Sequence, residues 1–168
     1  MRSLFVVVSG APGSGKSTLA APLARALDLP LIEKDVIKEA LADVLGAENL
    51  DESKWLGAAA IEVIVALARA NVGGVLESTW VREKARPQLH DLPSPIVEVL
   101  VDIPVDEAMR RYAQRAGTRH PVHFDDQRLE RADFVERSQP IDGGWPVIRV
   151  DGTSEVDVAA LARRVLSA

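Results

Sequence analysis

The feature that most constrains this sequence is the run GAPGSGKS at Gly10–Ser17, which fits the pattern G-x-x-x-x-G-K-S/T in full. A nearly continuous apolar segment, Leu4–Ser9, leads into the run, and an amphipathic segment, Lys16–Leu27, follows it. This order of strand, glycine loop and helix is the context in which the pattern forms a phosphate-binding loop. The backbone N–H groups of such a loop, together with the helix N-terminus, attract phosphate. The alternative is a glycine turn that only joins a strand to a helix, and this context disfavours it.

The residues of the loop have distinct expected roles. Lys16 is expected to reach the β- and γ-phosphates of ATP, and the hydroxyl of Ser17 to be a ligand of Mg²⁺. Thr18 adds a further hydrogen-bonding group. The nucleotide-binding residues expected here are Gly13, Ser14, Gly15, Lys16, Ser17 and Thr18.

Five short β-branched runs alternate with longer helical patterns along the chain. The expected strands are Leu4–Ser9, Pro30–Glu33, Gly74–Ser78, Ile96–Asp102 and Pro146–Asp151. The expected helices are Lys16–Leu27, Asp35–Leu45, Ser53–Ala70, Val81–Leu89, Val105–Arg115, Asp125–Arg137 and Val156–Leu166. Strand and helix in alternation predict an α/β fold with three layers and a five-stranded parallel sheet.

The length of 168 residues fits one domain with a sizeable core, so we expect a single domain over residues 1–168. Gly117 and Pro121 break the flanking helical patterns, and residues 116–124 are therefore expected to form a short lid. Apolar runs of strand length are too short to span a bilayer. The N-terminus lacks the pattern of a signal peptide, so we expect a cytoplasmic protein.

Charge and cysteine content narrow the function further. The net charge is −5, which disfavours a nucleic-acid partner because a polyanion is repelled by a negative field. The chain has no cysteine, which excludes disulfides, thiol catalysis and thiolate metal sites. Oligomeric state leaves no signal in the sequence.

Together with the loop, the chain resembles the small P-loop kinases, a group that includes nucleotide, gluconate and shikimate kinases, polynucleotide kinase, chloramphenicol phosphotransferase and zeta-toxin proteins. In the most similar of these families, an Asp just after the second strand acts as general base on the substrate hydroxyl. The run LIEKDVIKEAL places Asp35 at that point. Asp35 also begins an expected helix, so a capping role is the alternative. Lys38 matches the position of a substrate-binding Arg in polynucleotide kinase-like relatives; otherwise it is a solvated side chain.

The resemblance assigns roles to three arginines in the run VDIPVDEAMRRYAQRAGTRH. In adenylate kinase-like enzymes, an Arg seven residues after the Pro covers adenine, and an Arg four residues later touches the phosphates. Counting from Pro104, these positions fall on Arg111 and Arg115. Arg119, in the expected lid, is a further catalytic contact. The alternative for each arginine is a solvated basic helix face.

Two further sites come from the same resemblance. Glu77 closes the third expected strand, where many NTPases hold Mg²⁺ through an acidic residue. We assign it to metal binding through water, to substrate binding or to a hydrogen bond with the loop, and the alternative is a purely structural role. The turn formed by Asp151, Gly152 and Thr153 resembles the one that passes over adenine in nucleotide kinases. It also fits a plain capped turn between strand and helix.

The resemblance implies an ATP-dependent phosphotransferase with Mg²⁺ as cofactor. Its acceptor would be a hydroxyl of a small molecule, such as a sugar, a nucleoside or an antibiotic. The alternatives are a 5′-hydroxyl kinase for polynucleotides or nucleosides, which Asp35 with Lys38 would support, and a nucleotide-dependent switch. We expect the acceptor pocket between Asp35–Leu45, the helix from Ser53, and Ser78–Leu89. The acids Glu39, Asp43, Asp51 and Glu52 suit either a cationic acceptor or a solvated face.

Overall fold

The computed structural model describes residues 3–125 and 130–168. Its strands are β1 (Phe5–Ser9), β2 (Leu31–Glu33), β3 (Gly74–Glu77), β4 (Ile96–Asp102) and β5 (Val147–Asp151). They form one parallel sheet in the order β2-β3-β1-β4-β5, which confirms the expected fold class. β1, which leads into the phosphate loop, therefore lies in the centre. The carboxyl ends of the strands share one edge, where ligands of open α/β sheets bind.

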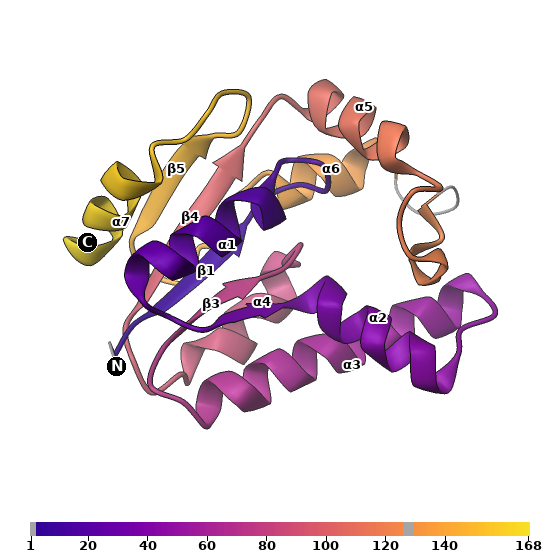
Figure 1. Cartoon of the computed structure of the whole chain (residues 1–168), viewed down its shortest axis with the longest axis horizontal. Helices are drawn as coiled ribbons and strands as arrows, with labels where there is room; N and C mark the ends of the chain where they lie inside the picture. The colour runs from indigo at the N-terminus through magenta and orange to yellow at the C-terminus, as the bar shows by residue number, and fades with distance from the viewer. Residues whose placement is uncertain (1–2, 126–129) are drawn as a thin grey trace.

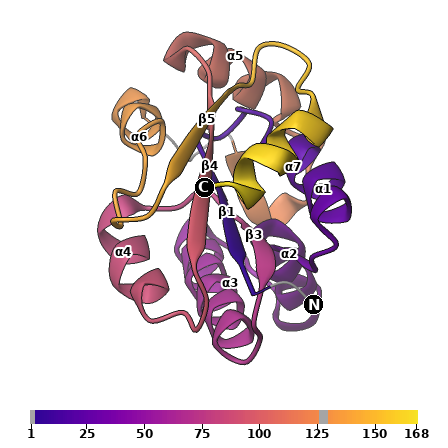
Figure 2. The same ribbon diagram turned by 90° about the vertical axis from the view of Figure 1, so that its left-hand side faces the viewer.

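The helices are α1 (Lys16–Leu27), α2 (Lys34–Leu45), α3 (Leu50–Arg69), α4 (Arg82–His90), α5 (Val105–Arg115), α6 (Arg131–Arg137) and α7 (Val158–Leu166), with a 3₁₀ helix η1 (Pro121–His123). α1 and α7 cover one face of the sheet, and α3 and α4 cover the other (Figure 1, Figure 2). Val6 and Val8 of β1 pack toward α1, whereas Phe5 and Val7 pack toward α3. Burial on both faces explains the continuous apolar pattern of this strand.

Two helices begin two or three residues away from the expected positions because a side chain caps the backbone. α3 begins three residues early because the Asn49 side chain accepts a hydrogen bond of 2.9 Å from the backbone N–H of Glu52. α7 begins at Val158, after Asp157 caps it. Of the helix expected at Asp125–Arg137, residues 131–137 are helical, whereas residues 126–129 lie outside the described part of the chain.

The start of α2 corrects one interpretation of Asp35. The N-cap residue of α2 is Glu33, and its side chain makes no capping hydrogen bond. Asp35 lies inside the first turn, so the prediction that it caps this helix is wrong. Its carboxylate is left for contacts with other parts of the molecule.

The segment expected as a lid follows α5 and contains η1. Gly117 has a φ of 79°, a left-handed conformation that explains why a glycine ends the helical pattern here. Within residues 3–125 and 130–168, the structure has no helix long and apolar enough to cross a membrane.

Candidate active site

The phosphate loop packs tightly against its surroundings. Gly13 has a φ of 82°, and a Cβ atom built on it would lie 2.5 Å from the backbone oxygen of Ala108 in α5. A Cβ atom on Gly10 would lie 2.5 Å from the backbone oxygen of Val101 in β4. Only glycine fits these two positions, because a side chain would clash with backbone atoms that cannot move aside.

Lys16 points into the loop from the first turn of α1. Its side chain is buried, and Nζ donates a hydrogen bond of 2.8 Å to the backbone oxygen of Ala11. Burial lowers the pKa of Lys16 to about 8, although the negative charges of Glu77 and Asp35 oppose this shift. A phosphate that entered the loop would replace the Ala11 carbonyl as a stronger partner for this ammonium group.

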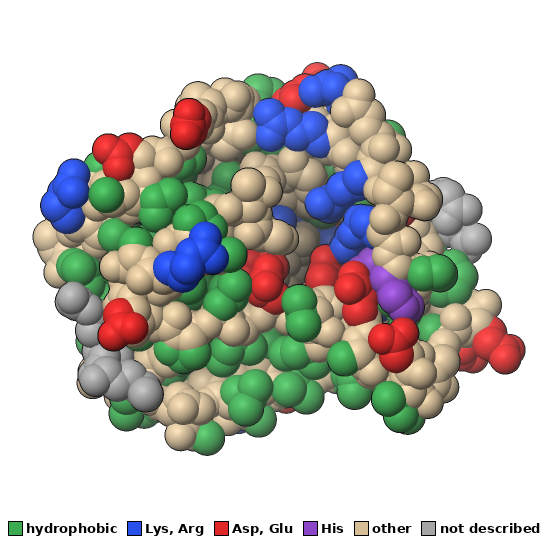
Figure 3. Space-filling view, in the orientation of Figure 1, with side chains coloured by type: hydrophobic (Ala, Val, Ile, Leu, Met, Phe, Trp, Pro, Cys, Tyr) green, Lys and Arg blue, Asp and Glu red, His purple; other side chains and the backbone are tan. Residues whose placement is uncertain are grey.

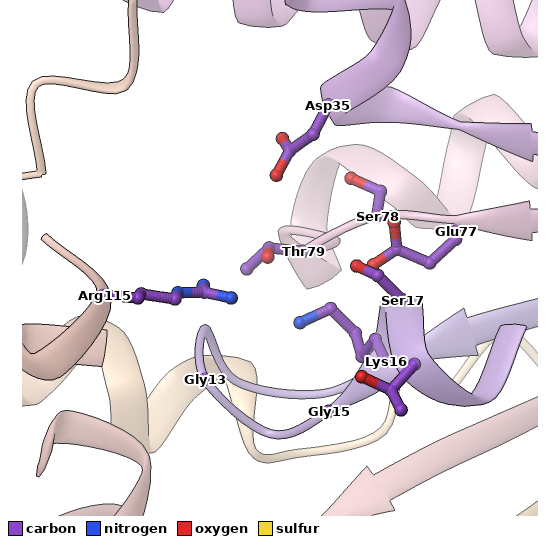
Figure 4. Close-up of a pocket in the computed structure, with 10 residues that line it drawn as sticks. Gly13, Gly15, Lys16, Ser17, Asp35, Glu77, Ser78, Thr79 and Arg115 are labelled. Atoms are coloured by element: carbon purple, nitrogen blue, oxygen red, sulfur yellow. The ribbon is translucent and has the colours of Figure 1, made fainter. Parts of the chain in front are cut away.

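A cavity of about 60 Å³ opens above the loop, and we call it the phosphate cavity. It is lined by Gly13, Gly15, Lys16, Ser17, Thr18, Asp35, Glu77, Ser78, Thr79 and Arg115. In Figure 4, Lys16, Asp35 and Arg115 approach the same space from three sides (Figure 4). The expected loop residues thus meet here, except that Ser14 is fully buried below the surface.

Asp35 stands at the edge of the phosphate cavity with two cations beside it. Its Oδ1 lies 3.4 Å from Nζ of Lys34, and its Oδ2 lies 2.5 Å from Nη2 of Arg119. Burial alone would raise the pKa of Asp35, but the positive charges of Lys34 and Arg119 outweigh it and hold the pKa at about 2. Asp35 is therefore ionised throughout the working pH range.

Glu77 also lines the phosphate cavity. It lies at the end of β3, and 4% of its surface is exposed. Burial raises the pKa of Glu77 to about 7, although the positive charge of Lys16 opposes the shift. The next residue, Ser78, is also buried, and its Oγ has no hydrogen-bond partner in the described part of the chain. An unused hydroxyl beside a carboxylate at this cavity suits a ligand that brings its own hydrogen-bonding groups.

The oxygens in the phosphate cavity fit a magnesium ion that is bound mainly through nucleotide phosphates. Ser17 and Thr18 supply exposed hydroxyls, and Glu77 supplies a carboxylate. The described residues contain no cluster of three or more His, Cys, Asp or Glu side chains that could hold a metal by themselves. Mg²⁺ in kinase sites is usually held by few protein ligands, by phosphates and by water, so this donor set is adequate.

A second cavity of about 620 Å³, which we call the acceptor cavity, adjoins the first. It is lined by Pro12, Lys34, Asp35, Lys54, Gly57, Ala58, Ile61, Glu62, Thr79, Trp80, Val81, Lys84, Gln88, Tyr112, Arg115, Arg119, His123, Asp125, Asp133 and Arg137. Three residues line both cavities, namely Asp35, Thr79 and Arg115. α3 and the segment after β3 form its walls as expected, whereas α2 contributes only Lys34 and Asp35.

Two of the expected arginines occupy different places. Arg115 lines both cavities, lies 5.6 Å from the ring centre of Tyr112, and has an Nε without a partner in the described residues. Arg111 instead donates hydrogen bonds to Glu107 (2.6 Å) and to the backbone oxygen of Gly152 (2.9 Å). Arg111 therefore contacts the turn at Asp151–Thr153, which was also expected to bind the nucleotide. It lines neither cavity.

The turn after β5 is held by its own side chains. The Asp151 carboxylate accepts hydrogen bonds from the backbone N–H (2.8 Å) and the hydroxyl (2.6 Å) of Thr153. A Cβ atom on Gly152 would lie 2.6 Å from the backbone oxygen of Ser14, so this glycine lets the turn pass close to the phosphate loop. Asp151 holds this turn, whereas the cap of the following helix α7 is Asp157. Contact of the turn with adenine stays a prediction.

Three pairs of oppositely charged or hydrogen-bonding side chains join the lid segment to acidic residues on one face of α2. The three pairs are Arg119–Asp35 (2.5 Å), His123–Glu39 (2.7 Å) and His120–Asp43 (3.1 Å). The acids are spaced four residues apart, which puts them on the same face of the helix. Figure 3 shows the resulting hollow, with Lys and Arg side chains above it, Asp and Glu side chains below it, and His beside it (Figure 3). Arg119 thus contacts Asp35 and does not line the phosphate cavity.

Two predictions about substrate contacts need correction. Lys38 is fully buried, and its Nζ donates hydrogen bonds to Oγ of Ser53 (2.8 Å) and to the backbone oxygen of Val122 (3.1 Å). It is neither solvated nor a lining residue of either cavity, because α3 and η1 cover it. The acids proposed for a cationic acceptor also lie outside the cavity. The carboxylates of Glu39, Asp43 and Asp51 pair with His123, His120 and Lys54, in that order. The carboxylate of Glu52 accepts hydrogen bonds from the side chain of Asn49 and from the backbone N–H of Glu48.

Several residues of the acceptor cavity were not predicted from the sequence. Thr79 directly follows Glu77 and Ser78 at the carboxyl edge of the sheet, a position that could have marked it. Tyr112 and Arg137 had no such signal, because periodicity does not show which helix face closes over a cavity.

A comparison with protein families matches residues 5–136 to the family AAA_33, described as an AAA domain. This match spans most of the chain. The chain belongs to this family. Shikimate kinase of Corynebacterium glutamicum is 35% identical over 135 residues, which are 79% of this chain and 73% of that protein. This relative places the chain in the P-loop kinase superfamily.

Two further similarities, one to a curated relative and one to a solved structure, cover nearly the whole of this chain. Gluconokinase of Gluconobacter oxydans is 29% identical over 163 residues, which are 94% of this chain and 88% of that protein. A crystal structure of a candidate kinase from Chloroflexus aurantiacus superposes with a TM-score of 0.81 at 26% identity, covering 99% of this chain and 98% of the other. The protein is therefore an ATP-dependent kinase, a phosphotransferase with an alcohol group as acceptor.

Proposed function

We propose that this kinase, with Mg²⁺ as cofactor, transfers the γ-phosphoryl group of ATP to a hydroxyl of a small, sugar-like molecule in the acceptor cavity. The observation that carries the proposal is that Asp35, Thr79 and Arg115 line both cavities. A γ-phosphate above the loop and a hydroxyl in the acceptor cavity would meet at these three side chains. Positioning of this kind supplies much of the rate of phosphoryl transfer.

In the transfer, the acceptor oxygen forms a bond to the γ-phosphorus, the bond from that phosphorus to the β–γ bridging oxygen breaks, and the acceptor hydroxyl loses its proton. Lys16 and the loop N–H groups hold the phosphates, and Ser17 would hold Mg²⁺. The ion, when bound, neutralises charge on the β- and γ-phosphates. Arg115 places a guanidinium beside the same phosphates and stabilises the charge that spreads over the γ-phosphoryl oxygens.

Asp35 orients the acceptor hydroxyl and receives its proton. A carboxylate whose pKa is about 2 is a weak base, so orientation comes first. Movement of Arg119 away from Asp35 would remove one of the positive charges that lower this pKa, and the carboxylate would become a stronger base at the same time as it becomes accessible.

The size of the acceptor cavity and the named relatives support a small, sugar-like acceptor. A volume of about 620 Å³ lies in the range of small-molecule sites. The relatives are a shikimate kinase and a gluconokinase, both named for hydroxyl-rich acids. The alternative of a 5′-hydroxyl kinase is weakened, because Lys38, one of its two supports, is buried away from the cavity.

A labelled-phosphate assay tests the proposal. The protein is incubated with ATP carrying a labelled γ-phosphate, Mg²⁺, and single sugars, sugar acids, nucleosides or oligonucleotides with free 5′-hydroxyls. We expect label in at least one small acceptor. Label only in oligonucleotide ends, or hydrolysis of ATP that no acceptor stimulates, would contradict the proposal.

A further inference from the structure

One side of the acceptor cavity is formed by three segments that come together only in the fold. Trp80 lies in the loop between β3 and α4, Lys84 in the first turns of α4, and Arg137 at the end of α6. Arg82 and Arg86 of α4 each donate a 3.0 Å hydrogen bond to the backbone just after α6, at the carbonyls of Pro140 and Ile141. These bonds hold α4 beside the end of α6. We call Trp80, Lys84 and Arg137 the donor corner.

Buried donors in this cavity lack partners. In the described residues, five buried side-chain polar atoms have no hydrogen-bond partner: Ser14 Oγ, Ser78 Oγ, Trp80 Nε1, Arg115 Nε and Arg137 Nε. Three of them line the acceptor cavity, and all three are N–H donors. Trp80 is only 5% exposed, so its indole N–H is shielded from bulk water. A buried donor without an acceptor is costly, which points to a ligand that supplies acceptors.

The carboxylates of the same cavity are already engaged. Glu62 accepts a hydrogen bond of 2.9 Å from the side chain of Gln88. Asp133 accepts one of 3.1 Å from the backbone N–H of Glu130, and lies 3.4 Å from Nη2 of Arg137. The remaining two, Asp35 and Asp125, both contact Arg119. Each of these carboxylates therefore has a partner, whereas the buried polar atoms without a partner among the described residues of this cavity are N–H donors.

The charged side chains that line the cavity are mostly positive, which also favours an anionic ligand. Its cations are Lys34, Lys54, Lys84, Arg115, Arg119 and Arg137, and its acids are Asp35, Glu62, Asp125 and Asp133. Among the residues that the structure describes, Lys84 and Arg115 make no ion pair. A neutral polyol would leave these charges and donors without an anionic partner, whereas a carboxylate or phosphate offers several acceptor oxygens at once.

We propose that the donor corner binds an oxyanion of the acceptor, a carboxylate or a phosphate, so that the substrate is an anionic hydroxy compound. The inference rests on the proposed function, because it assumes that the acceptor occupies this cavity. The hydroxyl that is phosphorylated lies at Asp35 and Thr79, and the oxyanion is on another part of the same molecule. Trp80 and Arg137 thereby determine which hydroxy compounds bind.

Titration calorimetry on the full chain, with a non-hydrolysable ATP analogue and Mg²⁺ present, tests the inference. The probes are gluconate, glucitol 6-phosphate and the neutral polyol glucitol. We expect at least one anion to bind about tenfold tighter than glucitol, as hydrogen bonds to a charged group allow. The identity of the tighter anion separates a carboxylate from a phosphate.

Three variants make the test specific. Trp80→Phe removes the indole N–H but keeps an aromatic side chain, and Arg137→Gln removes the guanidinium. Each should reduce the preference for the anion several-fold while the affinity for the ATP analogue stays the same. The control is Arg149→Gln, because Arg149 lies on β5 outside the cavity and pairs with Asp102 at 3.0 Å. It should leave all affinities unchanged.

Equal affinity for the three probes, absence of binding by both anions, or an anion preference that survives both variants overturns the inference. Transfer of phosphate to neutral acceptors alone would overturn it and leave the proposed function in place. Conversely, anion binding at the donor corner without transfer to any hydroxyl would contradict the proposed function and not the oxyanion site.

Discussion

Nη2 of Arg119 lies 2.5 Å from Oδ2 of Asp35, and Nη1 of the same side chain lies 3.1 Å from Oδ1 of Asp125. One arginine of the lid segment thus bridges two carboxylates of the acceptor cavity. The expected catalytic carboxylate is therefore held by a cation. The phosphates of ATP compete with carboxylates for such an arginine, so we expect nucleotide binding to release Asp35.

Replacement of Arg119 tests this exchange. We expect Arg119→Gln to lower kcat by about tenfold to a hundredfold, because transition-state charge on the phosphoryl group loses a donor, while the KM for the acceptor changes little. Steady-state kinetics measure both. Arg163→Gln, on the exposed side of α7, is the matched control and should behave as the parent. Unchanged kcat in Arg119→Gln would remove Arg119 from catalysis.

The pair between His123 and Glu39 predicts a lid whose attachment depends on pH. Burial lowers the pKa of His123 from 6.5, although its hydrogen bond to Glu39 opposes this. The docked lid therefore favours the neutral imidazole. Its stabilisation is complete above the ordinary pKa of 6.5 and is lost as the pH falls through the lowered value. Hydrogen exchange of residues 116–124, corrected for the intrinsic rate, should accelerate on acidification.

His123→Gln provides the control for the lid. Glutamine keeps hydrogen-bonding capacity but does not titrate, so the acceleration at low pH should be reduced. His90→Gln should retain it, because His90 is exposed on α4 and, within residues 3–125 and 130–168, pairs only with the neighbouring Asp91. Exchange that accelerates equally in the parent and in His123→Gln would assign the pH effect to other groups.

Glu77 and Lys16 predict the pH profile of the free enzyme. Burial raises the pKa of Glu77 to about 7 and lowers that of Lys16 to about 8. If Glu77 acts on the metal through water, it must be ionised, whereas Lys16 must be protonated. We expect a narrow bell for kcat/KM for ATP whose limbs belong to this pair. Glu77→Gln should remove the acidic limb, and an unchanged limb would exclude Glu77 as its source.

Lys16→Ala tests the phosphate loop. Loss of the ammonium should abolish detectable turnover of ATP, because this group is the loop's charged contact to the β- and γ-phosphates. The melting temperature should stay close to that of the parent, since Lys16 bonds only the Ala11 carbonyl in the described structure. ATP turnover at the parent rate would show that the loop is not the nucleotide site.

The layers of the fold could be read from the sequence because the strands are short, apolar and separated by clear helical patterns. β1 was recognisable since both of its faces are buried, and the loop because its glycines are required by close backbone contacts. The early start of α3 was also open to prediction, because Asn49 and Glu52 stand at capping-box spacing.

The arrangement around Asp35 could not be read in this way. Lys38 lies one turn from Asp35 and was expected on the same side, but it lines neither cavity. Its burial depends on α3 and on η1, which is remote in sequence. The pairing of Arg119 with Asp35 likewise joins residues 84 positions apart. Contacts of this kind follow from how the lid packs on α2, and no local pattern records that packing.

Asp35→Asn tests the role of Asp35 in phosphoryl transfer. We predict that transfer to the acceptor falls by about 10²–10⁴, while the Kd for ATP stays nearly unchanged because the triphosphate is held by the loop. The melting temperature should fall modestly, because asparagine loses the ion pairs of Asp35 with Lys34 and Arg119, whereas the N-cap of α2 is Glu33 and stays in place. An Asp35→Asn enzyme that transfers phosphate at the parent rate would contradict the proposed role of Asp35 and make Glu77 the next carboxylate to test.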